Sequence, residues 1–222
     1  MSIKAFLTGT LVMFSMLAFS QATKGKVMYD VFVSSDDPSV SAYVDQMENS
    51  LLEIFFSGNK TRTNFHMGEM MTTMTISVKE QDTVLVLLDG MMGKIAMKVT
   101  EDDMDDERRM ALEKQEVELI EGETKEVMGY TCKKAIIIGA DGNESTVWYT
   151  EEIAPAHREG EYLNEEIPGL PLEMTAKYGK MDMKIVAFEF KGKIKKEDEV
   201  FSLEVPEGFV LKTMEEMKSF GR

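Results

Sequence analysis

The sequence is poor in the residues that carry out most enzyme chemistry, since its 222 residues include one cysteine and two histidines. His66 and His157 stand in no known metal-binding or nucleophile motif, and no Gly-rich phosphate loop is present. Each histidine is better explained as an ordinary surface or edge residue than as a catalytic base. We therefore expect a protein that is not an enzyme, with no catalytic residue, no resident metal and no cofactor.

The single cysteine, Cys132, excludes an internal disulfide, so core packing must hold the fold together. Lys133 and Lys134 follow it and would make an exposed thiol more reactive. The simpler interpretation is a small apolar residue that faces the core of a strand.

Long apolar runs are confined to the first twenty residues. Lys4 precedes an apolar stretch over residues 5–19, and residues 18–20 (Ala-Phe-Ser) have the small-x-small pattern of a cleavage site. The stretch is too short to span a bilayer. We expect residues 1–20 to be a cleaved signal peptide and residues 21–222 a single domain, periplasmic or secreted. The absence of a cysteine near residue 21 predicts that no lipid anchor is attached there.

Positive charge is also scarce, because 25 Lys and Arg face 40 Asp and Glu, for a net charge of −15. A negative field of this size opposes nucleic acid and anionic lipid headgroups, so we expect no nucleic-acid partner. The acidic run over residues 101–107 lacks the ligand spacing and central glycine of a calcium loop, and a solvated helix start explains it better.

What the chain has in abundance is alternation of apolar and polar residues, which predicts half-buried antiparallel strands. Residues 74–78 (Met-Thr-Ile-Ser-Val) are the cleanest case. The other strand-like segments are 27–33, 52–56, 61–67, 84–88, 95–99, 129–138, 146–150, 172–178 and 183–190. Turn sequences at 57–59, 89–90 and 141–143 separate some of them and predict a meander of sequential hairpins.

Three segments have a helical pattern: 38–49, 100–114 and the tail from Val210 to Phe220. Asp37 and Pro38 provide a typical helix start for the first. Together the elements predict an α+β fold, in which a curved antiparallel sheet forms an incomplete, half-open β-barrel with covering helices.

Methionine is the unusual component: the chain has twenty, and ten of them cluster at 67–74, 91–97 and 174–183. Its flexible, polarizable side chain suits surfaces that accept variable apolar partners. Plain core packing is one alternative. Another is a Cu(I) site, because thioethers are soft ligands; its candidate ligands are His66, Met67, Met70, Met71 and Met74.

Several short motifs resemble the LolA/LolB superfamily of periplasmic lipoprotein carriers. These are Val147-Trp148-Tyr149-Thr150, the segment from Leu170 to Met174, the strand over 183–190, and the closing segment 205–210 with Phe201. The segments 59–62 and 129–134 look like the domain-of-unknown-function family 4412, and Pro168-Gly169-Leu170-Pro171 is similar to secreted proteins with a GLPGLI motif. The resemblance implies an incomplete barrel with helices over a concave apolar face, and it places Arg62 where carriers have a functional arginine.

The function predicted from these features is that of a soluble periplasmic carrier or chaperone for a lipid, a lipoprotein acyl chain or another apolar ligand. Transient contact with another envelope or membrane protein would accompany it, and we expect a monomer. The alternatives are the Cu(I)-binding envelope protein and an interaction module without a small ligand. The residues predicted to line the cavity are Leu52, Ile54, Phe56, Met74, Ile76, Val86, Met97, Trp148, Met174 and Phe188.

Overall fold

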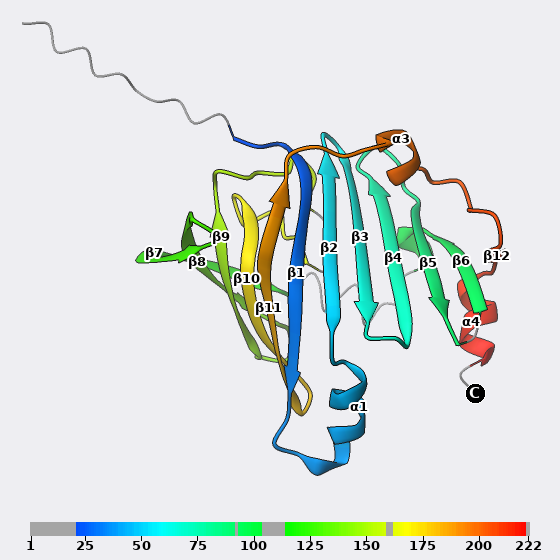
Figure 1. The fold of residues 1–222 in the computed structure, drawn as a ribbon, viewed down its shortest axis with the longest axis horizontal. Coiled ribbons are helices and arrows are strands. Elements are labelled where there is room, and N and C mark those ends of the chain that lie inside the picture. Colours follow the sequence, from blue (N-terminus) through cyan, green and yellow to red (C-terminus); the bar gives the residue numbers. More distant parts are fainter. Residues whose placement is uncertain (1–20, 92, 104–113, 159–161, 221–222) are drawn as a thin grey trace, which may run out of the picture.

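The computed structural model describes residues 21–91, 93–103, 114–158 and 162–220, and one twelve-stranded sheet dominates it (Figure 1). The predicted signal peptide, residues 1–20, lies outside the described residues. The strands are β1 (Lys24–Ser34), β2 (Ser50–Ser57), β3 (Lys60–Met67), β4 (Met71–Val78), β5 (Val84–Gly90), β6 (Gly93–Val99), β7 (Glu116–Val127), β8 (Tyr130–Ile138), β9 (Glu144–Thr150), β10 (Leu170–Tyr178), β11 (Met181–Lys191) and β12 (Val210–Leu211).

The strands run in the order β12-β6-β5-β4-β3-β2-β1-β11-β10-β9-β8-β7. The sequence predicted one meander, but the sheet contains two, β1 to β6 and β7 to β11. The chain crosses from β6 to the opposite end of the sheet at β7, and the second meander then returns to pair β11 with β1. That antiparallel junction runs from Lys26 opposite Lys191 to Ser34 opposite Asp182.

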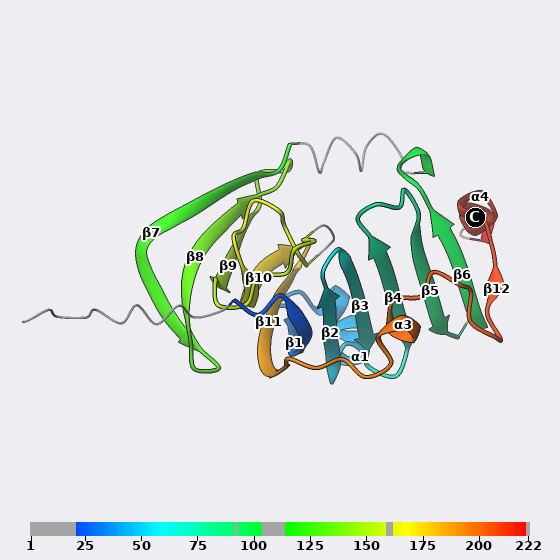
Figure 2. The ribbon, with the colours of Figure 1, turned by 90° about the horizontal axis from the view of Figure 1, so that it is seen from above.

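The sheet is bent but does not close, because β12 and β7 lie at opposite ends of it (Figure 2). Viewed from above, both ends rise on the same side, and the loop between β9 and β10 lies inside the curve. The predicted fold class, a curved antiparallel sheet that forms an incomplete barrel, is thus confirmed.

Helices play a smaller part than predicted. In place of a helix over 38–49, the short 3₁₀ helix η1 (Pro38–Val40) and α1 (Ser41–Gln46) lie at one end of β1 and β2 rather than over the sheet (Figure 1). Of the helix predicted over 100–114, the described part contains only η2 (Glu101–Asp103), and residues 104–113 lie outside the described residues.

The other helices are near the C-terminal end. They are α3 (Glu197–Val200) and α4 (Met214–Phe220). The tail helix was predicted to begin at Val210, but Val210 and Leu211 form β12, which pairs parallel with Ile95 and Ala96 of β6. Among the described residues, no helix combines the length and apolar character needed to cross a membrane.

The two faces of the sheet follow from the register of the strands. Val27, Ile54, Thr75, Val86 and Met97 lie on one face, across β1, β2, β4, β5 and β6. We call this the inner face, since the β9–β10 loop packs on it. The opposite, outer face carries the residues that alternate with these.

The described parts of the β9–β10 loop, residues 151–158 and 162–169, pack on the inner face. Ile153 and Leu163 belong to the same buried cluster as Leu52, Ile54 and Phe56. Side chains of this loop therefore occupy the centre of the curved sheet.

The C-terminal segment covers part of the outer face in the same way. Leu203, Val205 and Phe209 pack against a buried cluster from β4, β5 and β6. Members of that cluster are Ile76, Leu85, Leu87 and Ala96. The C-terminal segment thus buries the outer face of β4, β5 and β6, while the β9–β10 loop buries the inner face of β1 and β2.

Cys132 of β8 lies fully buried in the main core cluster, as the simpler interpretation of the sequence predicted. Burial raises the pKa of its thiol to about 11, and the negative charges of Glu126 and Glu173 add to this effect. The neutral thiol is therefore the favoured form at physiological pH.

Gly169 allows the loop to approach β9 closely. A Cβ atom there would lie 2.1 Å from the carbonyl oxygen of Thr150, a backbone atom. We expect Gly169→Ala to lower the free energy of unfolding by about 1–3 kcal/mol, because the backbone must shift to admit the methyl group. Gly192→Ala is the matched control, since nothing lies within 4 Å of a Cβ there. Urea denaturation measures both, and equal midpoints for the two variants would contradict the packing described.

The buried thiol gives a second prediction. In the folded protein Cys132 should react with iodoacetamide at pH 8 far more slowly than in urea, because the thiolate is the reactive species. Stability should also fall as pH rises from about 9 toward 11, since the unfolded chain releases the thiol proton first. Rapid labelling of the native protein, monitored by mass spectrometry, would contradict this. The pH-dependent loss should be absent in Cys132→Ala.

Candidate functional site: an apolar groove at one end of the sheet

The ten residues predicted to line a cavity do not share one face. Six lie on the inner face: Leu52, Ile54, Phe56, Val86, Met97 and Met174. Met74, Ile76 and Trp148 lie on the outer face. Phe188 sits at the irregularity in the pairing of β1 with β11, and its side chain is 45% exposed. The prediction of one continuous lining was wrong, because it chose residues from each strand without a common register.

The inner-face members include the most buried part of the core. Leu52, Ile54 and Phe56 have no exposed surface, and residues 153 and 163 of the β9–β10 loop pack into the same cluster. The centre of the predicted hollow is therefore filled by this loop.

Open space lies instead at the β6–β12 end of the sheet. One cavity of about 490 Å³ is lined by Gly93, Lys94, Ile95, Gly208, Val210, Lys212 and Met217. A second, of about 180 Å³, is lined by Met70, Met71, Leu88, Gly90, Met91, Gly93 and Ile95. Gly93 and Ile95 belong to both linings, so the two cavities adjoin. We call the pair the rim groove.

Hairpin register explains how the rim groove forms. Met71 pairs with Gly90, and Gly90 pairs with Gly93, so the ends of β4, β5 and β6 meet at one level. Two of these three positions are glycines, which leave space where side chains would otherwise stand. Leu88 and Ile95, also paired, form the apolar floor beside them.

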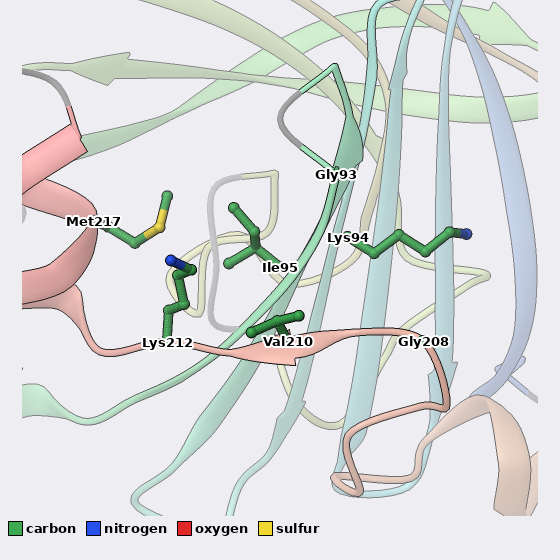
Figure 3. Close-up of a pocket in the computed structure, with 7 residues that line it drawn as sticks. All are labelled: Gly93, Lys94, Ile95, Gly208, Val210, Lys212 and Met217. Carbon is green, nitrogen blue, oxygen red and sulfur yellow. The ribbon is translucent and has the colours of Figure 1, made fainter.

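The larger cavity lies between β6, β12 and α4 (Figure 3). Met217 of α4 points toward Ile95, while the side chain of Lys94 points away, toward the neighbouring strands. The Nζ of Lys94 lies 2.6 Å from Asp89 Oδ2 and 5.4 Å from the centre of the Phe209 ring. The cavity thus has apolar walls at Ile95 and Met217, and the side chain of Lys212 extends between these two residues.

The structure places the ligands predicted for Cu(I) on two opposite faces of the sheet. Met67 and Met71 pair across β3 and β4 on the inner face, whereas His66 and Met74 lie on the outer face. His66 Nδ1 is 3.0 Å from Thr72 Oγ1, and Met74 Sδ accepts a hydrogen bond from Arg62. The set predicted from the sequence is therefore not one site.

Arg62, compared above with a functional arginine of the carriers, fastens the C-terminal segment to the outer face. Its Nη1 donates to the carbonyl oxygen of Val200 at 3.1 Å, and its Nε donates to Asn64 Oδ1 at 2.8 Å. Asn64 in turn donates to Glu53, which also forms an ion pair with Lys26. Burial tends to raise the pKa of Glu53, but the Lys26 and Asn64 hydrogen bonds outweigh it and hold the pKa low. These contacts hold the C-terminal segment and strands β1, β2 and β3 together.

His157 was expected at the surface or an edge but is fully buried in the β9–β10 loop. Its Nε2 lies 2.9 Å from Ser77 Oγ of β4, and its Nδ1 has no hydrogen-bond partner among the described residues. The contact ties the loop to the inner face. Nothing in the sequence around 154–158 indicated this, because the link depends on a partner eighty residues away.

Trp148, on the outer face of β9, is half-buried against the main core cluster and also lies beside charged side chains. Lys125 and Lys134 place their amines 5.6 and 6.0 Å from the centre of its ring. Glu173 forms ion pairs with Lys125 and Lys184 nearby. Trp148 therefore lies between the main core and a group of charged side chains, not in a cavity.

Sequence reasoning missed most of the rim groove. Glycines 90, 93 and 208 and the tail residues Val210 and Met217 were not predicted to line a site. The methionine clusters at 67–74 and 91–97 were noticed, and they were the one available signal. The register that brings their ends together is a property of the folded hairpins.

Comparison with solved structures places this fold among known proteins. PNGF-II, in the C2 crystal form, is matched at 16% identity and a TM-score of 0.54. The match covers 88% of this chain but 32% of PNGF-II, so this chain spans about a third of that protein. At this identity, the likeness concerns the fold alone.

Other solved structures are more remote. MucB in complex with the MucA(peri) segment is 10% identical over 81% of this chain and 54% of MucB, with a TM-score of 0.40. A LolA superfamily protein from Nitrosomonas europaea is 9% identical over 82% of this chain and 90% of its own, with a TM-score of 0.35. None of the curated proteins matches the sequence.

The match of the sequence to a family model is more direct. Residues 47–205, most of the chain, match the model described as "N-glycanase peptide, N-terminal domain". This is not the family 4412 suggested by the short motifs, although the open antiparallel sheet predicted alongside that resemblance is present. The matched range runs from the start of β2 to the segment that covers the outer face. The chain belongs to the N-glycanase peptide N-terminal domain family.

Proposed function

We propose that this protein is an exported, non-catalytic binding module that holds an apolar ligand, such as a lipid acyl chain, in the rim groove. The observation that supports this most is the pair of adjoining cavities around Ile95, lined by methionine, leucine, isoleucine and valine side chains. A volume of about 490 Å³ lies within the range of roughly 300–1,000 Å³ that is usual for small-molecule sites.

The chemistry of the lining favours binding over catalysis. The described residues around the two cavities include two lysines but no carboxylate, imidazole or thiol. General acid–base chemistry needs such groups within reach of a ligand. The glycanase named in the family description is therefore not proposed for this chain.

Burial of apolar surface would provide the affinity. Each methylene removed from water contributes about 0.8 kcal/mol, so a few carbons of an acyl chain give measurable binding. Lys212, which lines the larger cavity, would suit a ligand with a negative headgroup beside its apolar tail. This site lies at the end of the sheet rather than in the concave interior of the half-open barrel predicted from the sequence, where the β9–β10 loop lies.

A second candidate is a docking surface for an envelope protein, favoured by the exposed apolar side chains beside the groove. Val210 and Leu211 are 59% and 56% exposed, and Met91 is 92% exposed. Exposed apolar residues gathered in one region are typical of interaction sites. A small apolar probe separates the two, because a flat docking surface would hold it only weakly.

The test is binding of an environment-sensitive apolar dye, with displacement by a fatty acid. In Met71→Gln/Leu88→Gln, two half-buried groove residues become polar at similar size, and we expect affinity to fall at least about tenfold, equivalent to about 1.4 kcal/mol. Phe188→Gln, which changes an exposed apolar residue elsewhere, should bind the dye as the parent does.

Failure of the fatty acid to displace the dye, or an equal loss in Phe188→Gln, would refute a specific groove site. Far-UV circular dichroism of each variant checks that the sheet is intact. Native mass spectrometry of protein purified from its own source would then give the mass of any ligand retained.

A further inference from the structure

Three methionines from two different hairpins meet at the smaller cavity of the rim groove. Met70 lies in the turn between β3 and β4, Met71 is the first residue of β4, and Met91 lies in the turn between β5 and β6. Met67 lies directly opposite Met71 in the β3–β4 pair and extends the group. Thioethers separated by more than twenty residues in sequence are thus brought to one place.

Gly90 makes this approach feasible. A Cβ atom at Gly90 would lie 3.0 Å from the carbonyl oxygen of Met70 and 3.2 Å from the Cβ and Cγ of Met71. Any larger residue would push the β3–β4 turn away from β5. The glycine therefore holds the Met70–Met71 turn against the strand that leads into Met91.

We propose that Met67, Met70, Met71 and Met91 form a binding site for a soft monovalent metal ion, Cu(I). Thioether sulfur is a soft ligand that selects Cu(I), whereas Ca²⁺ and Mg²⁺ require oxygen ligands. The described lining of this cavity holds no carboxylate, so it offers hard cations no charged oxygen ligand. Cu(I) is bound and released without a change in oxidation state, so no electron donor or acceptor is needed.

This site differs from the one that the sequence suggested. His66 and Met74 are excluded, because they lie on the outer face with Thr72 and Arg62 as partners. Met91 is added, because hairpin register brings it to the cavity. With 92% of its side chain exposed, Met91 is open to an incoming ion.

The metal site goes beyond the proposed apolar-ligand function and does not depend on it. The same side chains serve both, but different properties are used: size and apolarity for a lipid, sulfur for the ion. Leucine retains the first property and lacks the second. A Met→Leu variant therefore distinguishes the two functions.

The experiment is anaerobic titration of the protein into a chromophoric Cu(I) chelator under reducing conditions. We expect the parent protein to withdraw one equivalent of Cu(I) and the variant Met70→Leu/Met71→Leu/Met91→Leu to withdraw none. Met174→Leu/Met183→Leu alters two half-buried methionines of β10 and β11 and should behave like the parent. Ag(I), an air-stable ion of the same charge, provides an independent probe.

Uptake that persists in the triple variant, or no uptake by the parent, would overturn the metal site. Dye binding measured on the same triple variant should remain, because leucine keeps the groove apolar. If dye binding is lost in Met71→Gln/Leu88→Gln while Cu(I) uptake is absent in the parent, the apolar function stands and the metal site falls. Circular dichroism confirms that the variants are folded.

Discussion

The pairing of β1 with β11 is the contact on which the rest of this structure depends. Each of the two meanders is local in sequence and bonded through its own hairpins, but only this junction joins them into one sheet. It connects residues near the start of the described chain to residues 148 to 165 positions later, so its loop-closure entropy is unfavourable. Apolar contacts across the junction offset this cost: Tyr29 faces Ala187 and Val31 faces Ile185, all four buried.

Once the sheet is joined, both of its faces carry apolar side chains that must be removed from water. The chain meets this requirement with two separate segments, the β9–β10 loop inside the curve and the C-terminal segment outside it. Tyr29 shows how closely the parts are fitted, since its buried hydroxyl donates to the carbonyl oxygen of Pro171. The rim groove lies at the β6–β12 end, where the covering segments leave Ile95 bordered by cavities.

Local features of this fold could be predicted from the sequence, and features set by distant pairing could not. The alternation in residues 74–78 or 183–190 fixes a strand and its two faces, because side chains alternate whatever the partner. The pattern does not say which face of one strand joins which face of the next. That is why Met74 and Val86 were placed in one lining although they lie on opposite faces. β7 was missed because five glutamates and Gly122 weaken its apolar pattern.

The two ends of the sheet differ in a way that bears on function. β7 is a long edge strand whose glutamates and register shift between Ile120 and Thr124 discourage another strand from pairing with it. At the opposite end, β12 covers β6 with only two residues, Val210 and Leu211, and both are exposed and apolar. An unprotected apolar edge is a liability in a chain selected for solubility alone, and the net charge of −15 shows how strongly the rest of the surface favours solvation. An apolar rim on so acidic a protein agrees with the ligand that we propose for the rim groove.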